Sequence, residues 1–339
     1  MNLRVLVVRL DNDGDVLLTG PALRAVAAEA GYVALLCGPR GQAAAELLPG
    51  IDEILCFRAP WIDPEPEPVE PAAVETLVEE LRRRELDQAI VMTSSHQSAL
   101  PSALVIRLAS VRIVAAISED YPGSLLDVRH RVPDDIHEVE RGLSLVATLG
   151  YRLPADDDGR LAVLRDEEAS APEGPYVVLH PGASVPARAP SSQWSSEAVN
   201  ALTAAGRRVV VTGGADEREL TAQVAGIDAV DLGGQTTFAE LASVLAQADC
   251  VVVGNTGPAH LAAAVGTPIV SLYAPVIPSV RWRPWRVPHI LLGDQEAPCR
   301  SSRERNCPVK GHPCLDGISA EEVVRAVDSL SPLRKDVAA

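Results

Sequence analysis

The feature that most constrains this chain is a regular alternation of short apolar segments with longer amphipathic ones. Near-continuous apolar runs of strand length indicate parallel strands that are covered on both faces, and the segments between them have helical periodicity. In the first half we expect strands at residues 3–10, 33–37, 53–57, 88–92 and 112–116, and helices at 16–30, 74–84 and 137–149. In the second half we expect strands at 176–180, 208–212, 229–232, 250–253 and 269–273, and helices at 196–205, 217–225, 238–247 and 258–265. The sequence therefore predicts an α/β fold with doubly wound sheets.

A polar interruption divides the alternation into two halves. Residues 154–158 and 165–174 are rich in Pro, Gly and acidic side chains, and a length of 339 residues suits two domains. We expect Rossmann-like domains at 1–160 and 170–339, facing a central cleft, with ligands beyond the carboxyl ends of the strands. A last helix over 319–330 could pack on either domain.

Charge restricts the partners. The net charge is −16, which disfavours nonspecific nucleic acid and anionic membranes, because both need a basic surface. Residues 1–170 carry 16 basic and 29 acidic side chains, whereas residues 281–310 carry seven basic and three acidic ones. An anionic ligand is therefore expected on the C-terminal half.

Targeting signals and a disulfide scaffold are not expected. The apolar run at the start is short and contains Arg9, and six cysteines in 339 residues do not make a disulfide framework. We expect a cytoplasmic protein with no stable membrane insertion.

Three loops that follow expected strands carry polar or small residues. The first is Asp11-Asn12-Asp13-Gly14-Asp15, where Asp15 is either a helix N-cap or a general base. The DxD spacing of Asp11 and Asp13 suits a metal poorly at this turn. The second loop, Pro181 to Arg188, is rich in small residues that let backbone N–H groups approach a phosphate. Its Arg188 is either a solvated side chain or a contact for a diphosphate.

The third loop is Gly254-Asn255-Thr256-Gly257-Pro258-Ala259-His260. Thr256 and Gly257 are expected at a helix N-terminus, which favours anions, and His260 lies one turn into that helix. A lone His is more often structural, but this position suits a phosphate contact.

Three segments in register resemble one family. The segments GDVLLTGPAL, PGASVPAR and GNTGPAHLAAAVGTPIVSLY resemble the ADP-heptose:lipopolysaccharide heptosyltransferases of glycosyltransferase family 9. The resemblance implies a GT-B fold, an acceptor on the N-terminal domain, a nucleotide-sugar on the C-terminal domain, and an inverting transfer without metal or cofactor. ADP-heptose is the donor that it implies, and a glycan or small molecule is the acceptor.

The resemblance also implies roles for particular residues. Asp15 falls on the general base. Donor contacts fall on Gly182, Ser184, Arg188, Glu217, Asn255, Thr256, Gly257 and His260. Asn255 departs from the family, in which Asp is common, and the segment after Arg188 is longer than the usual one. The match of Glu217 to a ribose-binding acid is loose.

The acceptor side is expected to comprise Asp13, Gly14, His96 and Gln97. Alternatively, Ser94 or Ser95 is a helix N-cap. Residues 91–102 contain no Lys or Arg, so we expect the acceptor not to be highly phosphorylated.

The tail holds Cys299, Cys307, His312 and Cys314 among basic residues. These four could bind zinc, but the C-x2-C spacing typical of such sites is missing, which favours reduced thiols. Family members carry one more Cys where Ser302 stands.

Three other functions are alternatives to sugar transfer. A sugar-nucleotide epimerase would share the fold, and a catalytically silent nucleotide-sugar-binding protein would fit the altered Asn255. A nicotinamide-dependent oxidoreductase is disfavoured, because no G-x-G-x-x-G follows a strand.

Overall fold

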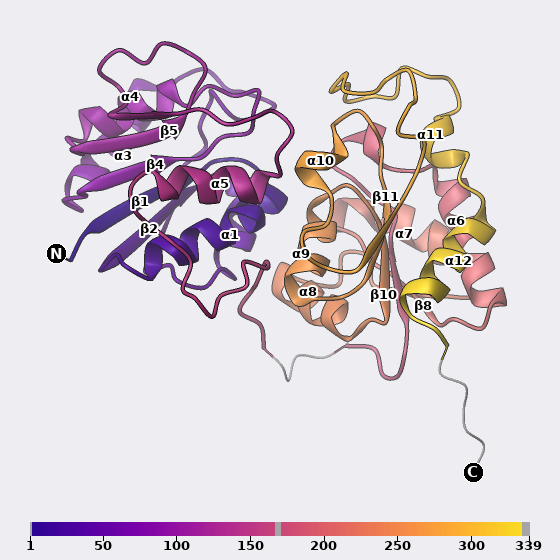
Figure 1. Ribbon diagram of the computed structural model, residues 1–339. Coiled ribbons are helices and arrows are strands. Elements are labelled where there is room, and N and C mark those ends of the chain that lie inside the picture. The colour runs from indigo at the N-terminus through magenta and orange to yellow at the C-terminus, as the bar shows by residue number, and fades with distance from the viewer. Residues whose placement is uncertain (1, 167–170, 334–339) are drawn as a thin grey trace. The chain divides into compact units, whose positions relative to one another are not determined.

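The computed structural model describes residues 2–166 and 171–333, so residues 167–170 of the predicted linker and residues 334–339 lie outside the described residues. The chain forms two compact units, residues 1–164 and 165–339 (Figure 1). Each unit is built around its own parallel sheet.

The described part of the first unit contains a six-stranded sheet in the order β3-β2-β1-β4-β5-β6. Its strands are β1 (Arg4–Arg9), β2 (Tyr32–Cys37), β3 (Glu53–Cys56), β4 (Gln88–Val91), β5 (Ile113–Ile117) and β6 (Val128–His130). Its helices are α1 (Asp13–Ala27), α2 (Gln42–Ala45), α3 (Pro71–Arg82), α4 (Leu100–Leu108) and α5 (Glu138–Ala147), with a 3₁₀ turn η1 (Pro39–Gly41). All strand pairs are parallel, and Arg9 at the end of β1 pairs with Cys37 at the end of β2.

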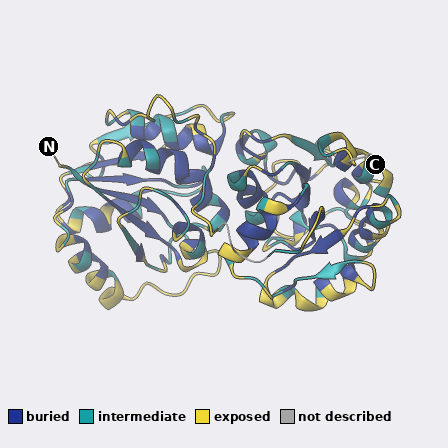
Figure 2. Cartoon of the chain, turned by 90° about the horizontal axis from the view of Figure 1, so that it is seen from below, coloured by how far each residue is buried: buried dark blue, intermediate teal, exposed yellow. Residues whose placement is uncertain are grey.

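The strands of the first sheet are buried because helices cover both faces (Figure 2). Alternate residues such as Leu6 and Val8 pack with Leu81 of α3 and Ile106 of α4 in one hydrophobic cluster. Helices α1 and α5 pack against each other, and strand residues of the opposite parity face the other side of the sheet. Burial on both faces explains why the central strands of this sheet, such as β1 and β4, are mostly apolar.

The described part of the second unit repeats this order as β12-β11-β10-β7-β8-β9. Its strands are β7 (Val177–His180), β8 (Val209–Val211), β9 (Val230–Asp231), β10 (Cys250–Gly254), β11 (Ile269–Leu272) and β12 (His289–Leu292). Its helical elements are η2 (Pro186–Arg188), α6 (Ser192–Ala204), η3 (Ala215–Glu217), α7 (Arg218–Ala225), α8 (Phe238–Gln247), α9 (Gly257–Val265), α10 (Ser279–Trp282), α11 (Pro313–Asp316) and α12 (Ala320–Leu330).

The last helix belongs to the second unit. Helix α12 packs against α6 and against β10, β11 and β12. Its Val323 and Val327 are fully buried in the same hydrophobic cluster as Trp194 and Leu202 of α6. Of the two positions that the sequence left open for this helix, the structure has the one on the C-terminal sheet.

Sequence and structure differ at two edges. Strands β6 and β12 were not predicted, because both are half-buried edge strands whose Val-Arg-His and His-Ile-Leu-Leu sequences lack the long apolar run of a central strand. Helix α8 begins with a capping box, in which the Glu240 N–H donates to Thr237 Oγ1 over 3.2 Å. No helix in the described ranges combines the length and the apolarity needed to cross a bilayer.

Candidate active site

Asp15 lies in the first turn of α1, immediately beyond the carboxyl end of β1. The helix begins at Asp13 rather than near residue 16, and its N-cap is Asn12, which makes no side-chain capping bond. The N-cap hypothesis for Asp15 is therefore wrong, because the Asp15 side chain is already inside the helix and points to a different partner.

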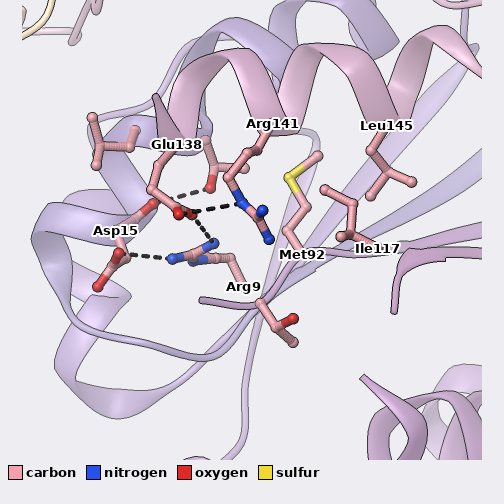
Figure 3. Close-up of a pocket in the computed structure, with 11 residues that line it drawn as sticks. Arg9, Asp15, Met92, Ile117, Glu138, Arg141 and Leu145 are labelled. Atoms are coloured by element: carbon pink, nitrogen blue, oxygen red, sulfur yellow. Dashed lines mark hydrogen bonds and ion pairs between the residues drawn. The ribbon is translucent and has the colours of Figure 1, made fainter. Parts of the chain in front are cut away.

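That partner is Arg9, the last residue of β1, which lies among three carboxylates. Figure 3 shows two of them, Asp15 and Glu138. The Arg9 guanidinium is 2.7 Å from Asp15, 2.9 Å from Asp11 and 3.8 Å from Glu138 at the start of α5. It also donates to Ser94 Oγ over 3.0 Å. Glu138 in turn is 3.3 Å from Arg141 one turn along α5. Two cations and three carboxylates thus share one site.

Exposure distinguishes these groups. The side chains of Arg9, Asp11, Glu138 and Arg141 are 2 to 9% exposed, whereas that of Asp15 is 21% exposed. Burial raises the pKa of Asp11 to about 6, with Arg9 opposing the shift. Burial would lower the pKa of Arg9, but its carboxylate neighbours raise it above its ordinary value. Asp15 is thus the carboxylate of this cluster that a ligand reaches, and Arg9 supplies a fixed positive charge behind it.

A small hollow opens beside Asp15 in the first unit. Its walls combine the charged cluster with hydroxyl and apolar side chains from α1, α5 and the ends of β4 and β5: Arg9, Asp15, Leu18, Thr19, Met92, Thr93, Ile117, Glu138, Arg141, Gly142 and Leu145. Figure 3 shows Met92, Ile117 and Leu145 as the apolar side of this hollow. The hollow has a volume of about 10 Å³, close to that of a single water molecule, so it marks the exposed side of Asp15 and does not itself enclose a sugar.

The residues predicted on the acceptor side do not line this hollow. Asp13 accepts a hydrogen bond from the Ala44 N–H over 3.0 Å, and Gly14 is buried in α1. Gln97 donates to Asp11 over 2.5 Å and accepts from the Ser94 N–H, and His96 is exposed. The structure thus gives Asp13 and Gln97 contacts within the chain and places neither beside Asp15.

The N-cap hypothesis for Ser94 or Ser95 is also wrong. The next helix, α4, begins six residues after Ser94, at Leu100, and its N-cap is Ala99. Ser94 is instead buried and bonded to Arg9. Its contribution to the site is therefore to hold the guanidinium.

In the second unit, Glu217 lies across the end of β7. Its Oε2 accepts a 2.8 Å hydrogen bond from the Gly214 N–H, and a Cβ atom at Gly182 would overlap its Oε1. Gly182 and Glu217 share the wall of a hollow of about 600 Å³ with residues of the tail, among them Cys307, Lys310 and His312. Glu217, which was matched only loosely to a ribose-binding acid, thus lines a pocket. Ser184, in the 181–188 loop, is exposed.

Arg188 and the 254–260 loop lie together. A Cβ at Gly254 would be 2.6 Å from the Arg188 carbonyl oxygen, so the two backbones touch only because residue 254 is glycine. Asn255 is buried and accepts from the Ala274 N–H over 3.3 Å. Burial raises the pKa of Tyr273, and Arg188 and Asn255 act on it in the opposite direction, so the tyrosine hydroxyl is close to both.

Helix α9 begins at Gly257, one residue earlier than predicted, with Thr256 as its N-cap. The Thr256 Oγ1 is buried and makes no hydrogen bond within the described part of the chain. In the first turn, Pro258 has no N–H, and the Ala259 N–H donates to the Thr256 carbonyl over 3.1 Å. His260 is 5% exposed in the first turn. Arg188, Thr256 and His260 thus come from two loops at the carboxyl ends of the neighbouring strands β7 and β10.

The tail cysteines are reduced. Cys299 and Cys314 are buried and Cys307 is half-buried. Burial raises the pKa of Cys314 to about 11, and the neighbouring Cys299 and Cys307 contribute to the rise. Across residues 2–166 and 171–333, no three His, Cys, Asp or Glu side chains are grouped as metal ligands would be.

Sequence reasoning missed Arg9, Glu138, Arg141 and His180. Arg9 ends an apolar strand, and a charged residue at that position was the available signal. Glu138 and Arg141 lie one turn apart at the start of a helix, a pattern that usually marks only a solvated surface. Nothing local shows that their helix begins beside Asp15.

Comparisons with known proteins agree with these features. The fold is that of two Rossmann-like α/β domains, as in glycosyltransferases of the GT-B type. Solved structures with it include a family 9 glycosyl transferase from Veillonella parvula (TM-score 0.77, 18% identity, 97% of this chain and 98% of that one). A second is ADP-heptose lps heptosyltransferase II of Escherichia coli, with a TM-score of 0.75 and 19% identity over 97% of this chain and 98% of that one. A third is the E. coli heptosyltransferase WaaC with ADP-2-deoxy-2-fluoro heptose, with a TM-score of 0.73 and 22% identity over 96% of this chain and 99% of that one. The predicted fold class is confirmed.

The family model of glycosyltransferase family 9 (heptosyltransferase) matches residues 74–312. The chain therefore belongs to this family. It is 34% identical over 168 residues to lipopolysaccharide heptosyltransferase 3 of Escherichia coli, covering 46% of this chain and 47% of that protein. It is 30% identical over 235 residues to lipopolysaccharide heptosyltransferase 1 of Pseudomonas aeruginosa, and the match covers 67% of this chain and 65% of that protein. The chain thus spans about half to two thirds of the length of these relatives.

Proposed function

We propose that this protein transfers a heptose from ADP-heptose to a hydroxyl of a glycan or small-molecule acceptor, with inversion and without a metal. Family membership supports the reaction class. The observation that carries the proposal is the Asp15 carboxylate, which is ion-paired to a buried guanidinium yet partly exposed beside a hollow.

An inverting transfer needs a base on the acceptor hydroxyl while that oxygen attacks the anomeric carbon. Arg9 lies behind Asp15, so it holds the carboxylate in place and leaves its exposed side for the acceptor proton. After proton transfer, the neutral carboxyl remains hydrogen-bonded to Arg9. The arrangement thus supports Asp15 as the proton acceptor.

The departing diphosphate needs positive potential. Arg188, the N-terminus of α9 and the Thr256 hydroxyl supply it in this proposal, with His260 beside them. Asp11 and Asp13 bind different groups, Arg9 and the Ala44 N–H, so the DxD spacing does not bring their carboxylates together on a metal. This supports a diphosphate held by side chains and backbone dipoles.

The donor identity rests on relatives. WaaC of E. coli, which shares the fold, was solved with an ADP-heptose analogue. The roughly 600 Å³ hollow beside Glu217 has room for a nucleoside, and Glu217 offers a carboxylate to its ribose. We infer that the nucleoside occupies this hollow.

Asp15→Asn tests the base. The amide keeps the size and the contact with Arg9 but cannot accept the proton. We expect kcat for heptose transfer to fall about 10²-fold or more, while the Kd for ADP measured by calorimetry stays unchanged.

Asp87→Asn is the matched control, because Asp87 accepts the Arg4 N–H over 2.9 Å at the opposite end of β1. It should retain kcat. If Asp15→Asn keeps wild-type turnover, the base is another residue; if turnover is absent in the wild type although ADP-heptose binds, the protein is a silent binder.

A further inference from the structure

His180 is a buried titratable side chain that the proposed chemistry does not use. It is the last residue of β7, directly before the Pro181-Gly182 loop, and is 7% exposed. Its Nδ1 is 3.0 Å from Thr212 Oγ1, just beyond the end of the neighbouring strand β8. Its Nε2 is 3.8 Å from Oε2 of Glu217. The His180 ring thus lies between the Thr212 hydroxyl on one side and the Glu217 carboxylate, which borders the hollow, on the other.

The protonation of His180 follows from its neighbours. Burial lowers the pKa of His180, so the ring is neutral near pH 7 and carries one N–H. A carboxylate near Nε2 favours the proton on that nitrogen, which leaves Nδ1 as an acceptor. The Thr212 hydroxyl then donates to Nδ1, and the Nε2–H dipole faces Glu217. Thr212 is fully buried, so water does not compete for this bond.

The Glu217 carboxylate has two different sides. Oε2 receives the Gly214 N–H and faces His180, and at 3.8 Å the latter interaction is electrostatic rather than a direct hydrogen bond. Oε1 lies over Gly182, where the missing side chain leaves room for it. Oε2 is therefore held by a hydrogen bond from the protein, whereas Oε1 only lies against Gly182, which also lines the hollow.

We propose that Thr212 and His180 are positioning residues that orient the Glu217 carboxylate toward the vicinal hydroxyls of the donor's ribose. This inference rests on the nucleoside assignment above. A carboxylate can accept hydrogen bonds from two neighbouring hydroxyls only if its orientation is fixed. The Nε2–H of His180 attracts Oε2 and so fixes the orientation of the Glu217 carboxylate, while Oε1 keeps its capacity to accept hydrogen bonds. Neither His180 nor Thr212 touches the nucleotide in this proposal.

Thr212→Val and Thr212→Ser form the matched pair that tests it. Valine keeps the shape but removes the hydroxyl, so the imidazole ring loses the hydrogen bond that holds its Nδ1 in place. We expect the Kd for ADP, measured by calorimetry, to rise about fivefold to tenfold in Thr212→Val, and Thr212→Ser to restore most of the affinity. The donor KM should rise by a similar factor with kcat nearly unchanged. Likewise, His180→Gln, which keeps a donor toward Glu217, should bind ADP more tightly than His180→Asn.

Two further variants separate positioning from general destabilisation. Thr267→Val removes another buried hydroxyl of the same unit, which donates to the Leu245 carbonyl over 2.7 Å, and should lower the melting temperature without changing the Kd for ADP. In a Glu217→Gln background, which weakens ADP binding itself, Thr212→Val should add little, because the carboxylate that it orients is gone.

The outcomes are distinguishable. If Glu217→Gln weakens ADP binding but Thr212→Val does not, or if the two effects add fully, the positioning role is wrong while the donor site stands. If Glu217→Gln binds ADP like the wild type, the nucleoside assignment fails and this inference fails with it.

Discussion

Arg9 is the residue on which the three carboxylates of the first site depend. Asp11 and Glu138 are buried, and charges in such surroundings persist only when a partner offsets the loss of water. The planar fork of Arg9 meets Asp11 and Asp15 through different nitrogens, Nε and Nη2, and Nη2 also reaches Ser94. A lysine would supply the positive charge, but its single ammonium group could not contact the two carboxylates through separate nitrogens.

We therefore expect Arg9→Lys to fold but to lose about tenfold in kcat, because Asp15 is no longer held in one orientation. The measurement is steady-state transfer together with a circular dichroism spectrum. Arg4→Lys is the control on the same strand, since Arg4 lies over the Tyr32 ring and away from Asp15. Wild-type kcat in Arg9→Lys would show that the guanidinium does not orient the base.

Single site residues could be predicted where a reactive or polar residue type directly follows an apolar strand in the sequence. Asp15 follows an apolar strand within a polar turn, and Gly254 to His260 combine a glycine turn with a helix start. Glu138 could not be found in this way, because 123 positions separate it from Asp15 and only the packing of α5 against α1 brings them together.

Helices α1 and α2 are joined by a hydrogen bond to a half-buried carboxylate. Asp13 opens α1 and accepts the Ala44 N–H of α2 over 3.0 Å. Burial raises the pKa of Asp13 to about 6, and the Ala44 hydrogen bond opposes the shift. Between about pH 4 and 6 the folded state therefore holds a proton that the unfolded chain has released, and the stability contribution of Asp13 falls as pH rises through this window.

Asp13→Asn keeps the acceptor oxygen and removes the charge. We expect this variant to be more stable than the wild type at pH 7.5, by up to about 3 kcal/mol, and nearly equal to it at pH 4. Urea unfolding at the two pH values measures the difference. A variant less stable than the wild type at pH 7.5 would contradict the burial cost of the charge.

The central strands were predicted, and so were the edge strands β3 and β9, whereas the edge strands β6 and β12 were not. Central strands such as β1 and β10 carry continuous apolar runs, because helices cover both sides of them. Strand β6 lies at the edge of the first sheet and β12 at the edge of the second. Both are half-buried, so their sequences show no clear hydrophobic periodicity. The start of α1 was missed by three residues, because Asp13 and Gly14 in its first turn carry turn-like sequences.

At the scale of the whole molecule, the two units have separate cores and different charges. Residues 1–170 carry a net charge of −13 and residues 171–339 a net charge of −3. We therefore expect a diphosphate to bind to the second unit, and an acceptor that is not highly phosphorylated to bind beside the three carboxylates and two cations of the first site.

Hydrogen exchange with and without ADP tests this division. We expect ADP to protect amides at the carboxyl ends of β7, β8 and β10 and in the first turn of α9, and to leave the first turn of α1 unchanged. Each protein amide serves as its own control in the same sample. Protection at Asp15 without protection at α9 would contradict the division of labour.

The amino-acid sequence alone was enough to predict the parallel α/β architecture and its two units, and to single out Asp15 and the start of α9 as candidate site residues. These features are local, because burial period, glycine turns and helix starts are set by neighbours in the chain. Only the tertiary structure decided that Arg9 gathers Asp11, Asp15 and Glu138, that Ser94 and Gln97 support this cluster, and that His180 stands behind Glu217. Such contacts join elements far apart in sequence, and their energies depend on burial that no single segment encodes.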